Sequence, residues 1–177
     1  NANKVLKWNQ DEGVTDYIFQ SGNTGYAPNT NGALLGANGL SFNSESKLIL
    51  CQHGDRRIAI AENTQSDKPS FTTLVDNYEG KKLNSPNDLT IASDGSIYFT
   101  DPPFGFFDLG TGSFVDSELK ELEFSGVFKL QKCQPPSSII LFSLYLSILQ
   151  KDLFLNFRSL NHWGDFKYFF IQILLPC

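Results

Sequence analysis

The sequence predicts an all-β fold made of repeated four-stranded units, on two observations: a hairpin pattern in mid-chain and an earlier copy of it. In the hairpin, Leu89 and Ile91 alternate with polar residues, Ser93-Asp94-Gly95 supplies a turn, and Ile97-Tyr98-Phe99 is a run of strand-forming residues. Residues 38–50 match this pattern at a constant offset of 49 residues. A repeat of this length, built from short strands and turns, is typical of a propeller or a solenoid.

The number of strands in each repeat favours the propeller. Two further strand patterns, Arg57 to Glu62 and Phe71 to Tyr78, lie between the copies and are separated by a polar run. Four strands in one period of this length make one propeller blade. Chance similarity between the copies is the competing explanation.

The remaining elements follow in order along the chain. Asn3 to Trp8 and Thr15 to Gln20 are predicted strands, the last two of a blade whose first half is missing. The Gly- and Asn-rich segment 21–36 is a connector. An insertion at 106–124 is either a lid or a disordered surface excursion. Gly126 to Leu130 is the third strand of the second blade. Because no Met begins the chain, we expect its N-terminus to be truncated.

The last 47 residues depart from this pattern. Segment 131–177 contains no Val, Ala, Thr or Glu, and 20 of its 47 residues are Leu, Ile or Phe. We therefore divide the chain into a propeller fragment of two to three blades, 1–130, and an irregular apolar tail, 131–177. This composition is typical of translated AT-rich non-coding sequence. A membrane anchor is the functional alternative, but the apolar run 139–149 is about half the ~20 residues that a spanning helix needs.

Composition and charge exclude several classes of function. The net charge of −5 offers no basic surface for nucleic acid. Three cysteines are too few and too scattered for a disulfide framework or a zinc site. The sequence contains neither the Gly-x-Ser-x-Gly elbow of serine hydrolases nor a phosphate-binding loop. We expect a soluble protein, with a cytoplasmic location slightly favoured, a membrane partner unlikely and the oligomeric state open.

Polar side chains lie at both open ends of the predicted hairpin. Asn87 and Asp88 precede its first strand, and Asp101 follows its second strand. The open ends of a hairpin lie side by side, so we expect a site at this edge of the sheet. Asn38 occupies the equivalent strand end one repeat earlier. The alternative for Asn87-Asp88 is an Asx turn that opens the strand.

The run Asn84-Ser85-Pro86-Asn87-Asp88-Leu89, followed by the segment 94–105, resembles the SMP-30/gluconolactonase family of calcium-dependent lactonases. Asn38-Gly39-Leu40 and the strand 126–130 also resemble blade strands of this family, so that the resemblance covers residues 1–130. It implies a six-bladed β-propeller with a divalent metal ion, calcium, at the mouth of the central channel. It also implies a small-molecule lactone or related ester as the substrate.

The resemblance places Asn87 at the metal and substrate site, and the positions of the other candidate residues suggest their roles. Asn87 and Asp88 are the expected metal ligands, because calcium binds carboxylate and amide oxygens. Asp101 is the candidate general base for the attacking water, with capping of the turn into Pro102-Pro103 as its structural alternative. Asn38 and His53 are the candidate substrate-binding residues; an internal turn and a solvated loop histidine are the alternatives.

The chain departs from the family pattern in two respects. The metal-binding Glu of the first blade, and the Asn and Asp of later blades, lie outside this chain, so we expect it to be inactive by itself. Ser85 stands where the family often has an Arg, which puts recognition of a sugar acid in doubt. Two alternatives stay open: a non-enzymatic propeller that serves as a binding scaffold, and an aryl-ester or phosphotriester hydrolase on the same framework.

Overall fold

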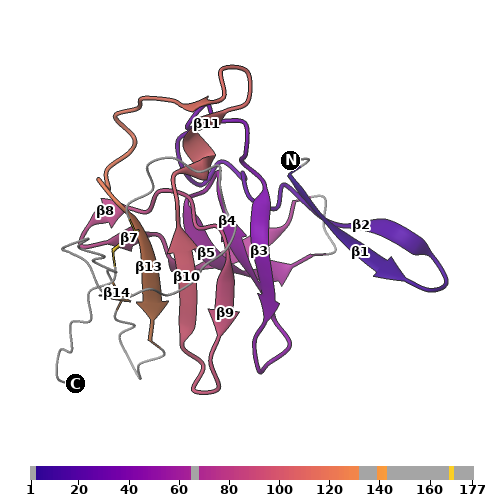
Figure 1. Cartoon of the computed structure of the whole chain (residues 1–177). Helices are drawn as coiled ribbons and strands as arrows, with labels where there is room; N and C mark the ends of the chain where they lie inside the picture. Colours follow the sequence, from indigo (N-terminus) through magenta and orange to yellow (C-terminus); the bar gives the residue numbers. More distant parts are fainter. Residues whose placement is uncertain (1–2, 65–67, 132–138, 143–167, 170–177) are drawn as a thin grey trace, which may run out of the picture.

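The computed structural model describes residues 3–64, 68–131, 139–142 and 168–169. In this part of the chain the regular structure consists of β-strands and one short 3₁₀ helix, η1 (Phe104–Phe106) (Figure 1). Two sheets, one of four strands and one of four strands with a short fifth, make up the body of the molecule. This architecture confirms the predicted all-β fold and partial propeller.

The first blade is a regular antiparallel meander. Its strands follow the order β3-β4-β5-β6 across the sheet. Their bounds are β3 (Ala37–Phe42), β4 (Leu48–Gln52), β5 (Arg57–Asn63) and β6 (Ser70–Val75). Each strand pairs with the next along the chain, as expected for sequential strands joined by short turns.

The second blade repeats this arrangement. Its strands are β9 (Leu89–Ile91), β10 (Ile97–Asp101), β13 (Ser125–Leu130) and β14 (Ile139–Phe142), in the order β9-β10-β13-β14. The position equivalent to Gly95 in the earlier copy is Ser46, and both have a positive φ, 82° and 59°. Each residue therefore supplies the left-handed turn of its hairpin.

The strand β14 lies in the segment where we expected no regular strand. It pairs antiparallel with β13, from Leu130 opposite Ile139 to Val127 opposite Phe142. A further short strand of that segment, β15 (Tyr168–Phe169), pairs in parallel with β13. Residues 132–138, 143–167 and 170–177 of the predicted tail lie outside the described part of the chain. The division of the chain at residue 130 therefore stays a prediction.

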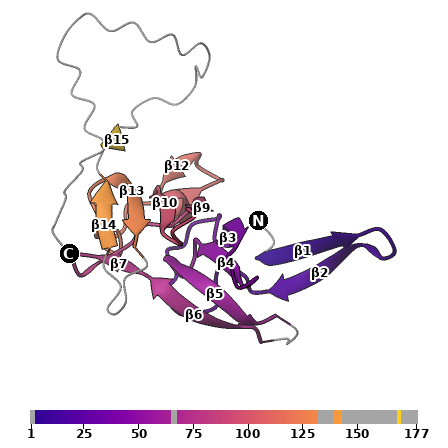
Figure 2. The same ribbon diagram turned by 90° about the horizontal axis from the view of Figure 1, so that it is seen from below.

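Three smaller hairpins accompany the blades. Each consists of two antiparallel strands. They are β1 (Lys4–Asn9) with β2 (Gly13–Phe19), β7 (Asn77–Tyr78) with β8 (Lys81–Lys82), and β11 (Phe107–Asp108) with β12 (Ser113–Phe114). The first of these is the predicted N-terminal hairpin, and it extends to one side of the body (Figure 2).

The insertion between β10 and β13 is anchored to both blades. It contains η1 and the β11–β12 hairpin. Its Phe106 and Leu122 are buried, and its Glu121 side chain accepts a hydrogen bond of 2.8 Å from the backbone amide of Lys82. The expectation of a disordered surface excursion was therefore wrong. A lid remains a prediction.

The strand β4 connects two hydrophobic clusters. All five of its residues are buried, and alternate side chains point to opposite faces of the sheet. Ile49 and Cys51 pack into a cluster shared with the second blade, whereas Leu48 and Leu50 pack into a cluster shared with the β1–β2 hairpin. The first blade is thus packed on both of its faces, as a blade inside a propeller must be.

Aromatic rings fill the cluster between the two blades. Phe128 is fully buried and stacks on Phe99 with ring centroids 5.3 Å apart. Tyr78 and Phe124 contact the same Phe128 ring at centroid distances of 5.4 and 6.4 Å. Packing of this kind joins residues of three segments that are far apart in the sequence.

The described residues contain no helix of the length and apolar character that a membrane-spanning helix requires.

Replacing Phe128 with Ala is expected to lower the free energy of unfolding by about 3–5 kcal/mol, because it leaves a cavity among the three rings. Phe42→Ala is the matched control, since the side chain of Phe42 is largely exposed (63%). Urea denaturation of both variants measures the difference. Equal, small effects would show that the rings do not form a packed core.

Candidate active site

The candidate site forms where the two blades meet. The strands β3 and β9 are each at the edge of their sheet. A hydrogen bond of 2.8 Å from the amide of Gly39 to the carbonyl of Asn87 joins them. Beside it, Nδ2 of Asn38 donates to Oδ1 of Asn87 at 2.5 Å. Two of the expected site residues, 49 positions apart in the sequence, are therefore in direct contact.

Gly39 makes this close approach possible. A Cβ atom at position 39 would lie 2.7 Å from Cα of Asp88 and 3.0 Å from the carbonyl oxygen of Asn87. Both are backbone atoms, which cannot move aside as a flexible side chain can. The glycine of the Asn-Gly-Leu sequence thus has a specific steric role: it lets the two strand ends approach closely enough for Asn38 to contact Asn87.

Asp88 lies at the start of β9, with its side chain exposed to solvent. Its Oδ1 accepts a hydrogen bond of 2.9 Å from the amide of Leu89. Its backbone amide donates to Oγ1 of Thr100, and its carbonyl accepts from the amide of Thr100. The side chain therefore opens the strand as an Asx residue does, and it still presents carboxylate oxygen to solvent.

His53 is buried, with 2% of its surface exposed, so it is not the solvated loop histidine of the sequence-based alternative. Its Nδ1 lies 3.0 Å from the carbonyl oxygen of Leu34. Burial lowers the pKa of His53, and hydrogen bonding to Leu34 and to the side chain of Asn87 partly opposes this shift. Its Nε2 is buried without a hydrogen bond of good geometry. The imidazole is thus held inside the protein, against the carbonyl of Leu34.

Asp101 is fully buried. Its Oδ2 accepts from the backbone amide of Asn84 and its Oδ1 from that of Ser85, each at 2.8 Å. Burial raises the pKa of Asp101 to about 7, while these two amides and the guanidinium of Arg56 oppose the rise. A general base must reach the water that it activates, and this carboxylate faces the backbone. The geometry therefore fits a buried loop cap better than the general base that we expected.

Arg56 is a functional candidate that the sequence reasoning did not single out. The side chain is buried, and its Nε donates to the carbonyls of Leu83 and Asn84 at 2.6 and 3.1 Å. Its guanidinium also lies over the ring of Phe106, 5.2 Å from the centroid. Arg56 comes from the β4–β5 turn of the first blade, so it fastens the connector that leads to Asn87. The sequence signal that could have pointed to Arg56 is the run of charged residues between two apolar strands.

The neighbouring charges of this turn are paired with each other. Arg57 and Asp55 form a buried salt bridge of 3.2 Å. The same Asp55 carboxylate accepts hydrogen bonds from the amide and the hydroxyl of Thr24, at 2.9 and 2.6 Å. Because both partners have further hydrogen bonds, the pair avoids the penalty of an uncompensated buried charge. It ties the connector 21–36 to the first blade.

The donor atoms at the blade junction fit part of a calcium site. Asn38 and Asn87 carry amide oxygens and Asp88 a carboxylate, and these are the hard donors that calcium prefers. Calcium takes six to eight oxygen ligands, so three side chains supply only part of a coordination shell. Within the described ranges no group of three or more His, Cys, Asp or Glu residues is placed to hold a metal ion.

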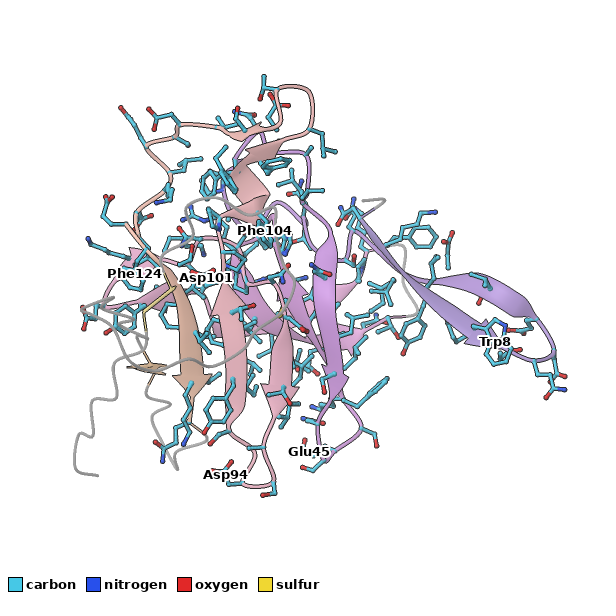
Figure 3. The ribbon with its side chains drawn as sticks, viewed as in Figure 1. Trp8, Glu45, Asp94, Asp101, Phe104 and Phe124 are labelled. Atoms are coloured by element: carbon cyan, nitrogen blue, oxygen red, sulfur yellow. The ribbon has the colours of Figure 1, made fainter. Side chains whose placement is uncertain are left out.

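A separate hollow of about 590 Å³ lies between the tips of the two equivalent hairpins. Glu45 and Asp94 line it, and they lie at the opposite end of the blades from Asp101 and Phe104 (Figure 3). Asn38, Asn87 and Asp88 do not contribute to this hollow. The candidate site and the hollow therefore belong to opposite ends of the blades.

Known proteins are similar to this chain in sequence and in fold. A gluconolactonase of Zymomonas mobilis is 35% identical over 129 residues, which cover 73% of the chain and 34% of that protein. The solved structure of a gluconolactonase from Xanthomonas campestris superposes with a TM-score of 0.59 and 31% identity, over 80% of the chain and 40% of its own. A second solved structure, a structural-genomics target described as a gluconolactonase candidate, superposes with a TM-score of 0.57 and 28% identity, over 78% of the chain and 41% of its own. No family model matches the chain.

These comparisons, together with the fold, identify the class of protein and the family to which the chain belongs. Stacked four-stranded blades and the two solved structures make the chain a segment of a β-propeller. The chain belongs to the SMP-30/gluconolactonase family. It spans about a third of the length of the curated relative that it matches.

Gly39→Ala is expected to destabilise the protein by about 1–3 kcal/mol, because the added methyl group forces the two blade edges apart. Gly110→Ala is the matched control: its Cβ would come no nearer than 3.3 Å to a heavy atom, Oδ1 of the Asp108 side chain. Urea denaturation measures both variants. A Gly39→Ala protein as stable as Gly110→Ala would contradict the close approach of β3 and β9.

Asp101→Asn tests the buried carboxylate through the pH dependence of stability. Because the folded pKa of Asp101, about 7, lies above its ordinary value of 3.8, the folded state binds this proton more tightly. The resulting stabilisation is complete below about pH 4 and is lost as the pH rises through about 7. We expect the wild-type free energy of unfolding, minus that of Asp101→Asn, to fall across this window. Urea denaturation at several pH values measures it, and a pH-independent difference would contradict the raised pKa.

Proposed function

We propose that the protein of which this chain forms part is a metal-dependent hydrolase of a sugar lactone or related ester, with calcium as the metal ion. The observation that carries the proposal is the contact between Asn38 and Asn87, which brings two amide groups to the junction of two blades. Membership of the SMP-30/gluconolactonase family, through relatives that are gluconolactonases, supports the reaction class.

Each side chain at the junction has a proposed task. Asn87 and Asp88 hold the cation through their oxygens, and Asn38 orients both Asn87 and the substrate. Bound calcium would supply a Lewis acid for the lactone carbonyl and lower the pKa of the attacking water. Because Asn38 and Asp88 are exposed on either side of Asn87, a substrate can reach this group from solvent.

Asp101 serves this site indirectly. Its carboxylate accepts hydrogen bonds from the amides of Asn84 and Ser85, which lie three and two residues before Asn87. Arg56 binds the carbonyls of the same connector. We therefore propose that Asp101 and Arg56 fix the connector, and that the proton acceptor for the water is another residue. The family resemblance assigns that role to an aspartate of a later blade.

Two other functions use the same framework. A binding scaffold would keep the blades and the Asn38–Asn87 contact without turnover. An aryl-ester or phosphotriester hydrolase would use the same metal on a different leaving group. Parallel assays on a lactone, an aryl ester and a phosphotriester separate these alternatives.

In the longer protein of which this chain forms part, Asn87→Ala is expected to lower calcium-dependent lactone hydrolysis about 100-fold while the fold is retained, because the cation loses a ligand and the substrate loses its orientation. Asn77→Ala is the matched control, since Asn77 is an exposed residue of β7 whose side chain bonds only to the adjacent Asp76. The measurement is lactone turnover at limiting calcium, with circular dichroism as the check on folding. Unchanged turnover in Asn87→Ala would remove Asn87 from the site.

A further inference from the structure

Thr100 makes three hydrogen bonds to the two residues that we expect to bind the cation. Its carbonyl oxygen accepts from the amide of Asn87 at 2.8 Å, and its amide donates to the carbonyl of Asp88 at 3.0 Å. Its side-chain Oγ1 accepts from the amide of Asp88 at 3.2 Å. Thr100 belongs to β10 and lies directly before Asp101. A single residue of the second blade thus binds the backbone of both expected ligands.

These hydrogen bonds have the pattern of a β-bulge. The regular pairing of β9 with β10 ends at Leu89 opposite Phe99. Because the amide of Thr100 donates to the carbonyl of Asp88, a regular ladder would return a bond from the amide of Asp88 to the carbonyl of Thr100. That carbonyl accepts from Asn87 instead. Two residues therefore stand opposite one, which is the arrangement of a bulge.

The hydroxyl of Thr100 satisfies the amide that the bulge displaces. The amide of Asp88 has lost its ladder acceptor to Asn87, and Oγ1 of the same threonine takes the place of that acceptor. A threonine hydroxyl has two lone pairs that can accept. Valine has nearly the same shape and no acceptor. The oxygen of this side chain, and not its shape alone, therefore completes the hydrogen bonding of the bulge.

The first blade contains a bulge at the equivalent position. The pairing of β3 with β4 shifts register there, so that Asn38 and Gly39 stand opposite Cys51. These three positions are each 49 residues before the three positions of the bulge in the second blade. Bulges are common next to active sites, where they re-aim a side chain. Recurrence at one place in two blades makes this bulge a feature of the repeat and not a local irregularity.

The two bulges satisfy their displaced amides in different ways. In the first blade, the amide of Gly39 donates across the blade junction to the carbonyl of Asn87 at 2.8 Å. The residue equivalent to Thr100 is Cys51, whose sulfur is only a weak acceptor. In the second blade, the amide of Asp88 is bonded within its own blade by the threonine hydroxyl. This difference accounts for a hydroxyl at position 100 and none at position 51.

We propose that Thr100 is a positioning residue of the candidate site, and that its hydroxyl holds the bulge that sets the directions of the Asn87 and Asp88 side chains. In a regular strand, consecutive side chains point to opposite faces of the sheet. A bulge interrupts this alternation and redirects a side chain. The role of these side chains in binding a cation rests on the proposed function, whereas the bulge and its dependence on Thr100 do not.

The hydroxyl decides between two hydrogen-bonding arrangements. Without it, the amides of Asn87 and Asp88 compete for one acceptor, the carbonyl oxygen of residue 100. If the amide of Asp88 takes that carbonyl, the regular ladder is restored and Asn87 loses its backbone anchor. The contact of Asn87 with the side chain of Asn38 is then no longer supported. A binding site needs its donor atoms held in one geometry by their surroundings, and Thr100 supplies this constraint.

The first test measures hydrogen exchange of the Asp88 amide by NMR on the ¹⁵N-labelled chain without calcium. We expect slow exchange in the wild type and in Thr100→Ser, and exchange about tenfold faster in Thr100→Val, because only valine removes the acceptor. Thr90→Val is the matched control, since Thr90 is an exposed threonine of β9. Its Asp88 amide is expected to exchange as in the wild type. Equal exchange rates in Thr100→Val and the wild type would overturn the proposal.

The second test measures calcium binding by isothermal titration of the longer protein with calcium chloride. Thr100→Val is expected to weaken binding about tenfold, as is typical when a residue that orients a metal ligand is removed. Thr100→Ser keeps the hydroxyl and is expected to weaken binding less than about twofold. Equal losses in the two variants would overturn the positioning role of the hydroxyl.

The two tests separate this inference from the proposed function. If the wild-type longer protein binds no calcium while the exchange rates follow the expected order, the proposed function fails and the role of Thr100 in the bulge stands. Circular dichroism shows whether each variant keeps its strands. Should Thr100→Val not fold, the wild type and Thr100→Ser decide the matter: slow exchange of the Asp88 amide in both supports the proposal, and rapid exchange in either overturns it.

Discussion

The structure depends on how the connector between the two blades is hydrogen-bonded. The connector leads from β8 to β9 and contains buried polar backbone, which must find partners within the protein. Arg56 of the first blade donates hydrogen bonds to carbonyls of the connector, and Asp101 of the second blade accepts hydrogen bonds from its amides. Arg56 thus binds the carbonyls of Leu83 and Asn84, and Asp101 binds the amides of Asn84 and Ser85, so that both hold Asn84. Asn87 lies two residues after Ser85, so its position depends on these hydrogen bonds.

The sequence predicted the features that follow from local pattern and repetition. The alternation of Leu89 and Ile91, the turn at Gly95 and the offset of 49 residues led to two blades with Asn38 and Asn87 at equivalent strand ends. The direct contact between these two side chains was found only in the structure. These features were predictable because a repeat puts equivalent residues at equivalent strand ends. When blades stack, equivalent strand ends come together.

The sequence could not reveal the roles that arise from burial. Asp101 has the residue type of a general base and the position of one, but its carboxylate faces two backbone amides, which is a matter of tertiary contact. His53 was expected to bind substrate at the channel mouth, with a solvated loop histidine as the alternative, yet it is buried. The charges of its turn are satisfied by one another and by backbone carbonyls, so the whole turn is buried. Nor did the composition of the last 47 residues predict that β14 would pair with β13.

The two-sided burial of β4 links neighbouring structural units thermodynamically. Ile49 and Cys51 belong to one hydrophobic cluster and Leu48 and Leu50 to the other. Local opening of either neighbour exposes one face of the same strand, so the opening free energies of the two clusters are coupled. Such nearest-neighbour coupling is how a repeat architecture acquires cooperativity beyond a single repeat. A disturbance in the N-terminal hairpin is therefore transmitted through one strand to the cluster against which Leu89, two residues after Asn87, is packed.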